Sequence, residues 1–115
     1  MNSFFYNTVI ELPEFQKTIS KILTEVEKED LIDYLAINPK SGNVIPGTGG
    51  IRKLRWSRKG MGKRGGTRVI YYYYNENIPL FLLTAFSKSE KTNISKEESK
   101  KLANFVNELL DDYQR

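Results

Sequence analysis

Residues 51–86 have the sequence IRKLRWSRKGMGKRGGTRVIYYYYNENIPLFLLTAF. Three segments within it, 51–56, 67–74 and 78–86, are predicted to be strands. The residues Asn75-Glu76-Asn77, between the second and third segments, are typical of a hairpin turn. Because short connections join antiparallel neighbours, the three segments are expected to lie side by side in one sheet.

The N-terminal third predicts one strand and two helices. Residues 3–10 supply β-formers and are expected to form a first strand. Pro13 suits the first turn of a short amphipathic helix. Thr24 followed by Glu27 has the spacing of a capping box, so a second helix is expected from there to about Ile37. The residue before a proline avoids the α region, and the Asn-Pro pair at 38–39 therefore ends this helix.

The C-terminal third predicts a longer helix. Ser95 and Glu98 have the spacing of a second capping box. A helical stripe of apolar residues follows: Leu102, Phe105, Val106, Leu109, Leu110 and Tyr113. The resulting order, β-α-α-β-β-β-α, predicts an α+β fold with a small, mainly antiparallel sheet packed by helices. The 115 residues fit one domain, 1–115, and show no repeat or linker.

The composition excludes several kinds of chemistry. The chain has no cysteine and no histidine. It therefore has no disulfides, no thiolate or imidazole metal ligands, and no catalytic triad that depends on histidine. We predict neither a metal nor a cofactor. No apolar run approaches the roughly 18–20 residues that a membrane span needs, and the N-terminus lacks the pattern of a signal peptide, so we expect a cytoplasmic protein without a membrane partner.

Positive charge is concentrated in the centre of the chain. The net charge is only +4, but no acidic residue lies between Asp33 and Glu76. The interval contains nine basic residues: Lys40, Arg52, Lys53, Arg55, Arg58, Lys59, Lys63, Arg64 and Arg68. The remainder of the chain is acidic overall. A charge run is often a solvated face, but this one is interleaved with glycines and aromatics, which favours a polyanionic partner such as a nucleic acid.

A glycine-rich loop lies inside this basic region. Residues 60–65, GMGKRG, match the pattern G-x-G-x-x-G. A dinucleotide site needs those glycines to open a helix, whereas here they lead into a predicted strand. We therefore expect a loop that brings its basic side chains to phosphates. The expected RNA or ribosome contacts are Arg52, Arg58, Lys59, Lys63 and Arg64.

Four cations lie on or just after the predicted strands: Lys53, Arg55, Arg68 and Lys88. If the strands are neighbours, these side chains can converge on one face and grip a phosphodiester. The alternative is four unrelated surface charges. Tyr72 shares a face with Arg68 because side chains alternate along a strand, and it is a candidate for stacking on a base. Val69, Tyr71 and Tyr73 are expected in the core.

Three stretches of the chain resemble one known family. The segments at 38–56 (NPKSGNVIPGTGGIRKLRW), 62–72 (GKRGGTRVIYY) and 86–90 (FSKSE) resemble the HigB branch of the RelE/ParE toxin superfamily. The resemblance implies a toxin of a type II toxin–antitoxin system that enters the ribosomal decoding site and cuts translated messenger RNA. It implies catalytic roles for Arg68, Lys53, Arg55 and Lys88, and an antitoxin, the ribosome and messenger RNA as partners. The family often has a tyrosine or another polar group in its C-terminal active-site segment, where this chain offers only Tyr113, far along the predicted helix.

Two other functions remain open at this point. A ParE-like relative would inhibit DNA gyrase instead of cutting RNA, although such relatives generally lack the basic set of residues. A non-catalytic nucleic-acid-binding module would use the same positive charge for salt-sensitive phosphate contacts and would release no cleavage products.

Overall fold

The computed structural model describes residues 6–57 and 66–114. Within these residues, five strands form one sheet, and three helices pack against its two faces. The elements are β1 (Val9–Glu11), α1 (Pro13–Ile19), α2 (Glu25–Ile37), β2 (Asn43–Val44), β3 (Ile51–Ser57), β4 (Gly66–Tyr72), β5 (Leu80–Ser87) and α3 (Lys96–Gln114). The α+β prediction is confirmed.

The sheet has the order β1-β5-β4-β3-β2. Strands β2, β3, β4 and β5 pair antiparallel, whereas β1 runs parallel to β5 with Val9 opposite Leu80. The central strand β4 is buried along its whole length. A register shift between Ile70 and Tyr71 marks the pairing of β4 with β5. The centre of the sheet is therefore the three-strand unit expected from residues 51–86.

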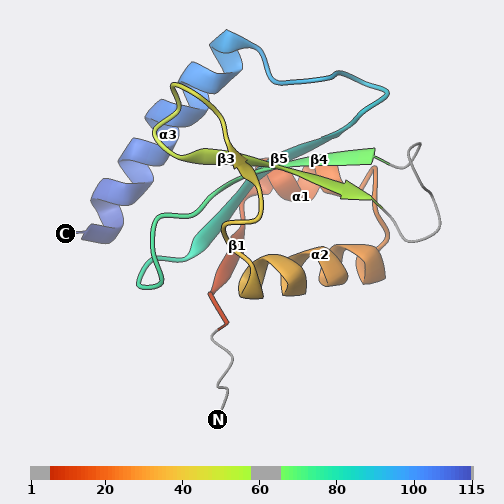
Figure 1. The fold of residues 1–115 in the computed structure, drawn as a ribbon, viewed down its shortest axis with the longest axis horizontal. Coiled ribbons are helices and arrows are strands. Elements are labelled where there is room, and N and C mark those ends of the chain that lie inside the picture. The colour runs from red at the N-terminus through yellow and green to blue at the C-terminus, as the bar shows by residue number, and fades with distance from the viewer. Residues whose placement is uncertain (1–5, 58–65, 115) are drawn as a thin grey trace.

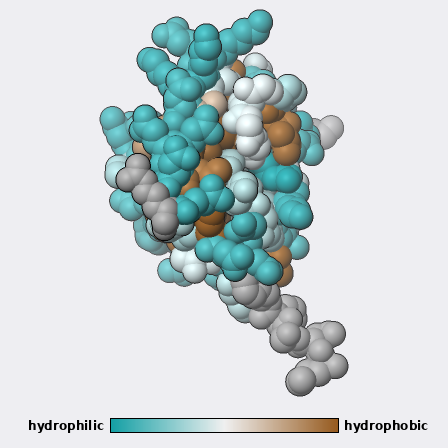
Figure 2. All heavy atoms as spheres, turned by 90° about the vertical axis from the view of Figure 1, so that its left-hand side faces the viewer, coloured by the Kyte–Doolittle hydropathy of each residue, from teal (hydrophilic) through white to brown (hydrophobic). Residues whose placement is uncertain are grey.

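Helices cover both faces of the sheet (Figure 1). On one face α1 and α2 pack through Phe15, Leu31 and Leu35 against the sheet. On the other face α3 buries Val106 in a second apolar cluster, which includes Ile70. Figure 2 faces the α3 side, where a strip of hydrophobic side chains shows within a largely hydrophilic surface. No helix in residues 6–57 or 66–114 has the length and apolar character needed to cross a membrane.

The first strand begins later than the sequence predicted. Strand β1 starts at Val9, and residues 6–8 are not in a strand; residues 1–5 lie outside the described part of the chain. Asn7 explains the late start, because its backbone and side-chain amides both donate to the carbonyl of Ala36, at 2.9 and 3.0 Å. A residue held at the end of α2 in this way is not available to extend the ladder with β5.

Other strand boundaries also differ from expectation. The two-residue strand β2 lies between the expected second helix and the strand expected from residue 51, where the sequence predicted no strand. Strand β4 ends at Tyr72 instead of Tyr74, and β5 begins at Leu80, after Pro79. Proline has no amide hydrogen to donate to the ladder, which fits a start after it. Val69 and Tyr71 are fully buried as expected, and Tyr73 is partly buried against the same cluster.

A buried tyrosine attaches the 39–42 segment to the sheet. The Tyr71 hydroxyl donates to the Pro39 carbonyl and accepts from the Gly42 amide, both at 2.8 Å. A Cβ atom at Gly42 would lie 2.8 Å from the ring of Tyr71, so the glycine permits this close approach. Burial raises the pKa of Tyr71, which keeps the hydroxyl protonated as the donor. The same segment leads directly into Asn43 of β2.

The predicted capping box opens α2. The Thr24 hydroxyl accepts from the Glu27 amide at 3.2 Å, and the Glu27 carboxylate accepts from the Thr24 amide at 2.7 Å. We expect Thr24→Ala to lower the free energy of unfolding by about 1 kcal/mol, because the first turn loses an amide partner. Urea unfolding followed by circular dichroism measures the change. Thr24→Ser keeps the hydroxyl and should restore most of the loss; an equally unstable serine variant would contradict the capping explanation.

Candidate active site

The central strands bring three of the four predicted cations together. Lys53 and Arg55 are two residues apart on β3, so their side chains leave the same face of the sheet. Arg68 on β4 is the register partner of Arg55. All three share a face with Ile51 and Ile70, which belong to the apolar cluster beneath α3. The predicted convergence of positive charge is therefore present for these three residues.

These cations line a cleft with a volume of about 670 Å³. Its lining comes from β2, β3, β4 and the segment that connects β5 to α3: Asn43, Lys53, Arg55, Arg68 and Thr92. No carboxylate is present among these lining residues, so within the described part of the chain the cleft is positive and polar. A concave site of this charge suits a phosphodiester.

Arg68 is the most unusual side chain in the cleft. Only 8% of the residue is exposed, and its Nη1 is buried without a hydrogen-bond partner among the described residues. Burial, together with the positive charge of Arg55, lowers the pKa of the Arg68 guanidinium. The guanidinium nevertheless stays charged at neutral pH. A buried N–H without a partner is costly, and an anionic oxygen entering the cleft would satisfy it.

Lys53 is held by a residue that the sequence did not single out. Its Nζ donates to Oδ1 of Asn93 at 3.2 Å. Asn93 lies next to Thr92 in the segment between β5 and α3. Residues 87–95, SKSEKTNIS, form a polar run between a strand and a capping box. That run was the only sequence signal that could have indicated these residues; Asn43 had none.

The segment that carries Thr92 and Asn93 is anchored at several points. Lys91 pairs with Glu98 at 3.0 Å and lies over the Phe86 ring, 5.1 Å from its centroid. Glu98 also accepts from the Ser95 amide at 3.1 Å, and the Ser95 hydroxyl accepts from the Glu98 amide at 3.1 Å. The predicted second capping box is therefore confirmed. It fixes the start of α3 next to the cleft.

Glu98 should make the stability of the protein depend on pH. The Ser95 amide and then Lys91 lower the pKa of Glu98 below its ordinary value. A lowered carboxyl pKa stabilises the fold fully above the pKa of the unfolded chain, about 4.3, and this contribution is lost as pH falls through the lower folded value. We expect Glu98→Gln to be less stable than the parent at pH 7, with a difference that shrinks toward pH 3.

Urea unfolding over a pH series tests the role of Glu98. Glu97→Gln is the matched control, because Glu97 is an exposed carboxylate in the same turn whose ion pair with Lys101 is long, at 3.8 Å. The control should follow the parent protein closely. A constant difference between Glu98→Gln and the parent at every pH would contradict the assigned interaction.

Two other predicted site residues, Lys88 and Arg52, are not among the residues that line the cleft. Lys88 is exposed and its amide donates to the Gly66 carbonyl at 3.0 Å, but it is not among the cleft-lining residues. Arg52 alternates with Lys53 and so faces the other side of the sheet, where its Nη1 donates to the carbonyls of Lys40 and Gly42 at 3.1 and 2.7 Å. The loop residues lie outside the described part of the chain: Arg58, Lys59, Lys63 and Arg64.

The expected open position of Tyr72 is wrong. Tyr72 does share a face with Arg68, but it is only 3% exposed and belongs to the apolar cluster that contains Val106 of α3. Strand alternation placed the tyrosine on the correct face. The long C-terminal helix then covers this part of the face, so the ring packs in the core and is not available for stacking on a base.

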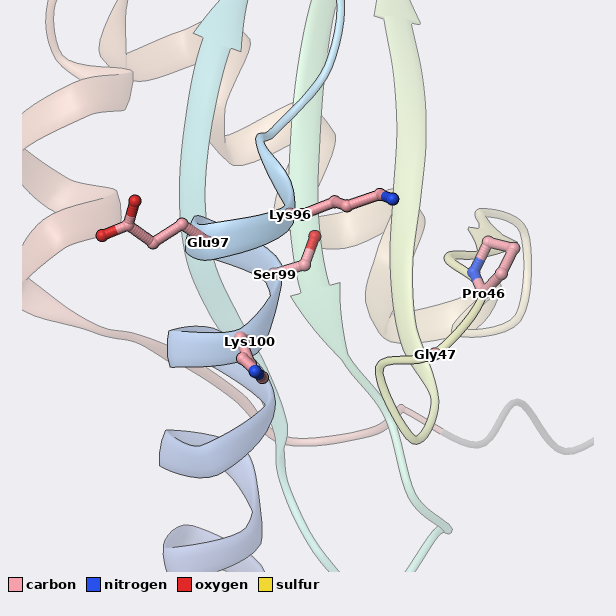
Figure 3. Close-up of a pocket in the computed structure, with 6 residues that line it drawn as sticks. All are labelled: Pro46, Gly47, Lys96, Glu97, Ser99 and Lys100. Atoms are coloured by element: carbon pink, nitrogen blue, oxygen red, sulfur yellow. The ribbon is translucent and has the colours of Figure 1, made fainter.

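A second hollow lies between the β2–β3 loop and the start of α3 (Figure 3). Its volume is about 520 Å³, and Pro46, Gly47, Lys96, Ser99 and Lys100 contribute to its lining. Lys96 extends toward β3, whereas Glu97 points away on the other side of the helix. Its lining residues are exposed apart from the half-buried Ser99, so it lacks the buried, unpartnered group found at Arg68.

Comparisons with known proteins agree with this architecture. The family model described as "RelE toxin of RelE / RelB toxin-antitoxin system" matches residues 14–114. Among solved structures, the chain is similar to a double-arginine mutant of the E. coli toxin RelE in the free state. The two chains share 15% identity with a TM-score of 0.56, over 88% of this chain and 97% of the other. At that identity the structural likeness supports the fold alone.

Proposed function

The chain belongs to the RelE toxin family of toxin–antitoxin systems, and from this premise we propose that it is a ribosome-dependent endoribonuclease of the HigB type, which cuts translated messenger RNA. The observation that carries the proposal is the buried N–H of Arg68, which has no hydrogen-bond partner among the described residues and lies beside Arg55 and Lys53 in one cleft. Because RNA presents its scissile phosphate as an anion, the cleft offers it charge and hydrogen-bond donors at the same place.

The proposed reaction uses the 2′-hydroxyl of the RNA as nucleophile. Its oxygen forms a bond to the adjacent phosphorus while the bond to the 5′-oxygen breaks. One proton leaves the 2′-hydroxyl and one is delivered to the departing 5′-oxygen. Between these events, negative charge grows on the non-bridging oxygens, and a guanidinium can donate two parallel hydrogen bonds to them. Preorganised donors of this kind commonly supply the largest share of catalysis.

The three cleft cations suit different parts of this reaction. Arg68 is buried on the central strand, so its guanidinium is the most rigid donor and is assigned to the non-bridging oxygens. Arg55, its exposed register partner, is assigned to stabilise the negative charge on the same oxygens from the solvent side. Lys53 is the candidate for moving a proton, because an ammonium can both donate and, once neutral, accept one. Lys88, outside the cleft lining, is assigned to the RNA backbone.

Cleavage should depend on the ribosome. The cleft contains few groups to hold a flexible strand with its 2′-oxygen in line with the leaving oxygen, and that alignment accounts for much of the barrier. A ribosome presents messenger RNA in a fixed conformation and can supply the missing positioning. The protein would then act in the cytoplasm and would be held inactive by an antitoxin whose acidic side chains cover or distort the cleft.

The test is primer extension on messenger RNA in a reconstituted translation system. We expect defined cut sites in ribosome-bound messenger, few or none in the same RNA without ribosomes, and loss of cutting when the cognate antitoxin is added. Robust cutting of free RNA would contradict the ribosome dependence. Salt-sensitive RNA binding without any product would instead identify a binding module, and inhibition of DNA supercoiling in a parallel gyrase assay would identify the ParE-like function.

A further inference from the structure

We propose that Asn93 positions the reactive ammonium of Lys53, and that the side chain at position 93 must carry a neutral amide and not a carboxylate. Its catalytic consequences rest on the function proposed above. The contact itself is geometric: Oδ1 of Asn93 accepts from Nζ of Lys53 at 3.2 Å, across 40 positions of sequence. It joins β3 to the segment between β5 and α3, on the rim of the cleft that Thr92 lines.

The acceptor atom is itself held in place. Oδ1 of Asn93 also accepts from the amide of Ile94 at 3.0 Å, so the side chain folds back on its own backbone. Ile94 is 7% exposed and is packed in the apolar cluster beneath α3. The oxygen that meets Lys53 is therefore fixed relative to the core, which is what a positioning residue needs.

Lys53 requires such a support because its side chain is flexible. A lysine has four rotatable side-chain bonds and about 2 kcal/mol of rotamer entropy. Its neighbours in the cleft, Arg55 and Arg68, are both positive and push the ammonium away. Among the described residues that line the cleft, none is acidic. Asn93 provides the hydrogen-bond acceptor that directs Nζ. Because its amide is neutral, it leaves the full positive charge of Lys53 available to a phosphate.

This reasoning separates two substitutions at the same position. Asn93→Ala removes the acceptor, so Lys53 is no longer directed. Asn93→Asp keeps an acceptor at the same reach but adds a negative charge, which holds the ammonium in an ion pair and opposes the entry of a phosphate. We expect both variants to cut ribosome-bound messenger more slowly, Asn93→Ala by about 10-fold to 10²-fold, the range that a small misplacement costs.

A double-mutant cycle distinguishes positioning from a general structural effect. If Asn93 acts through Lys53, Asn93→Ala should cause no further loss in a Lys53→Ala background under single-turnover conditions. Lys91→Ala is the matched control, because it weakens another anchor of the same segment without touching Lys53. Any loss that it causes should add to that of Lys53→Ala. Additive losses for Asn93→Ala would overturn the proposal.

A measurement that does not depend on activity separates this proposal from the proposed function. The ¹⁵Nζ resonance of Lys53, assigned by comparison with Lys53→Arg, should be slow to exchange with solvent in the parent protein. We expect it to shift and exchange faster in Asn93→Ala but not in Lys91→Ala. An unchanged resonance would refute the contact even if cleavage falls. A changed resonance in a protein that never cuts RNA would instead refute the nuclease function and retain the contact.

Discussion

Arg68→Ala should lower the rate of ribosome-dependent messenger cleavage by about 10²–10³-fold, the typical cost of removing one preorganised donor from a charge-stabilising site. Arg68 is the only buried cation of the cleft lining within the described chain, and its Nη1 has no partner among the described residues. Nothing in the described fold depends on a hydrogen bond from that atom. We therefore expect the variant to remain folded while expression no longer arrests growth.

Two further variants sharpen this result. Arg68→Lys keeps the charge but cannot form the two-pronged contact to phosphate oxygens, so it should recover only part of the activity. Lys21→Ala removes an exposed cation on the loop after α1, away from the cleft, and should cut at the parent rate. Circular dichroism spectra that match the parent protein confirm folding. Undiminished cleavage by Arg68→Ala would remove this residue from the mechanism.

The arrangement of the site follows from sequence where strands decide it. Alternation along a strand places Lys53 and Arg55 on one face, because the side-chain period of a strand is two. That Arg68 shares this face follows from the register of β3 with β4, in which Arg55 lies opposite Arg68. The capping boxes at Thr24 and Ser95 were equally predictable, since each depends on two residues three positions apart. These local rules do not need knowledge of the tertiary structure.

Sequence rules failed where distant segments meet. Alternation gave the correct face for Tyr72 but could not show that α3 covers it, because the path of a C-terminal helix over the sheet is a long-range property. The strands β1 and β2 span three and two residues, too short to show a period. Asn43, Thr92 and Asn93 reach the cleft from connecting segments. Their contribution depends on how the loops pack, which no local pattern encodes.

A site arranged for an anion should reduce stability when no anion is bound. Arg55 and Arg68 face each other as a cross-strand pair, and like charges in that position destabilise a sheet. Arg68 adds the cost of a buried N–H that has no partner within residues 6–57 and 66–114. The proposed function and stability thus make opposite demands on the same residue, a conflict that is common in active sites. A substitution that removes the charge but keeps the bulk should show both effects at once.

We therefore expect Arg68→Met to raise the free energy of unfolding by about 1–3 kcal/mol, the usual cost of burying a polar group without a partner. Methionine retains the apolar stem that packs in the sheet and fills much of the same space. Urea unfolding at neutral pH and low salt measures the gain. The same variant should lose cleavage as Arg68→Ala does, so it would be more stable and inactive.

Lys21→Met is the matched control for stability, because it makes the same chemical change at an exposed position. Surface substitutions of this kind usually change the free energy of unfolding by no more than about 0.5 kcal/mol. Inorganic phosphate provides a second check. If phosphate binds at Arg68, it should raise the free energy of unfolding of the parent protein and so reduce the difference in stability between the parent and Arg68→Met. If Arg68→Met is less stable than the parent protein, the guanidinium supports the fold. That result would contradict the conclusion that the anion-binding arrangement of the cleft lowers the stability of the unbound protein.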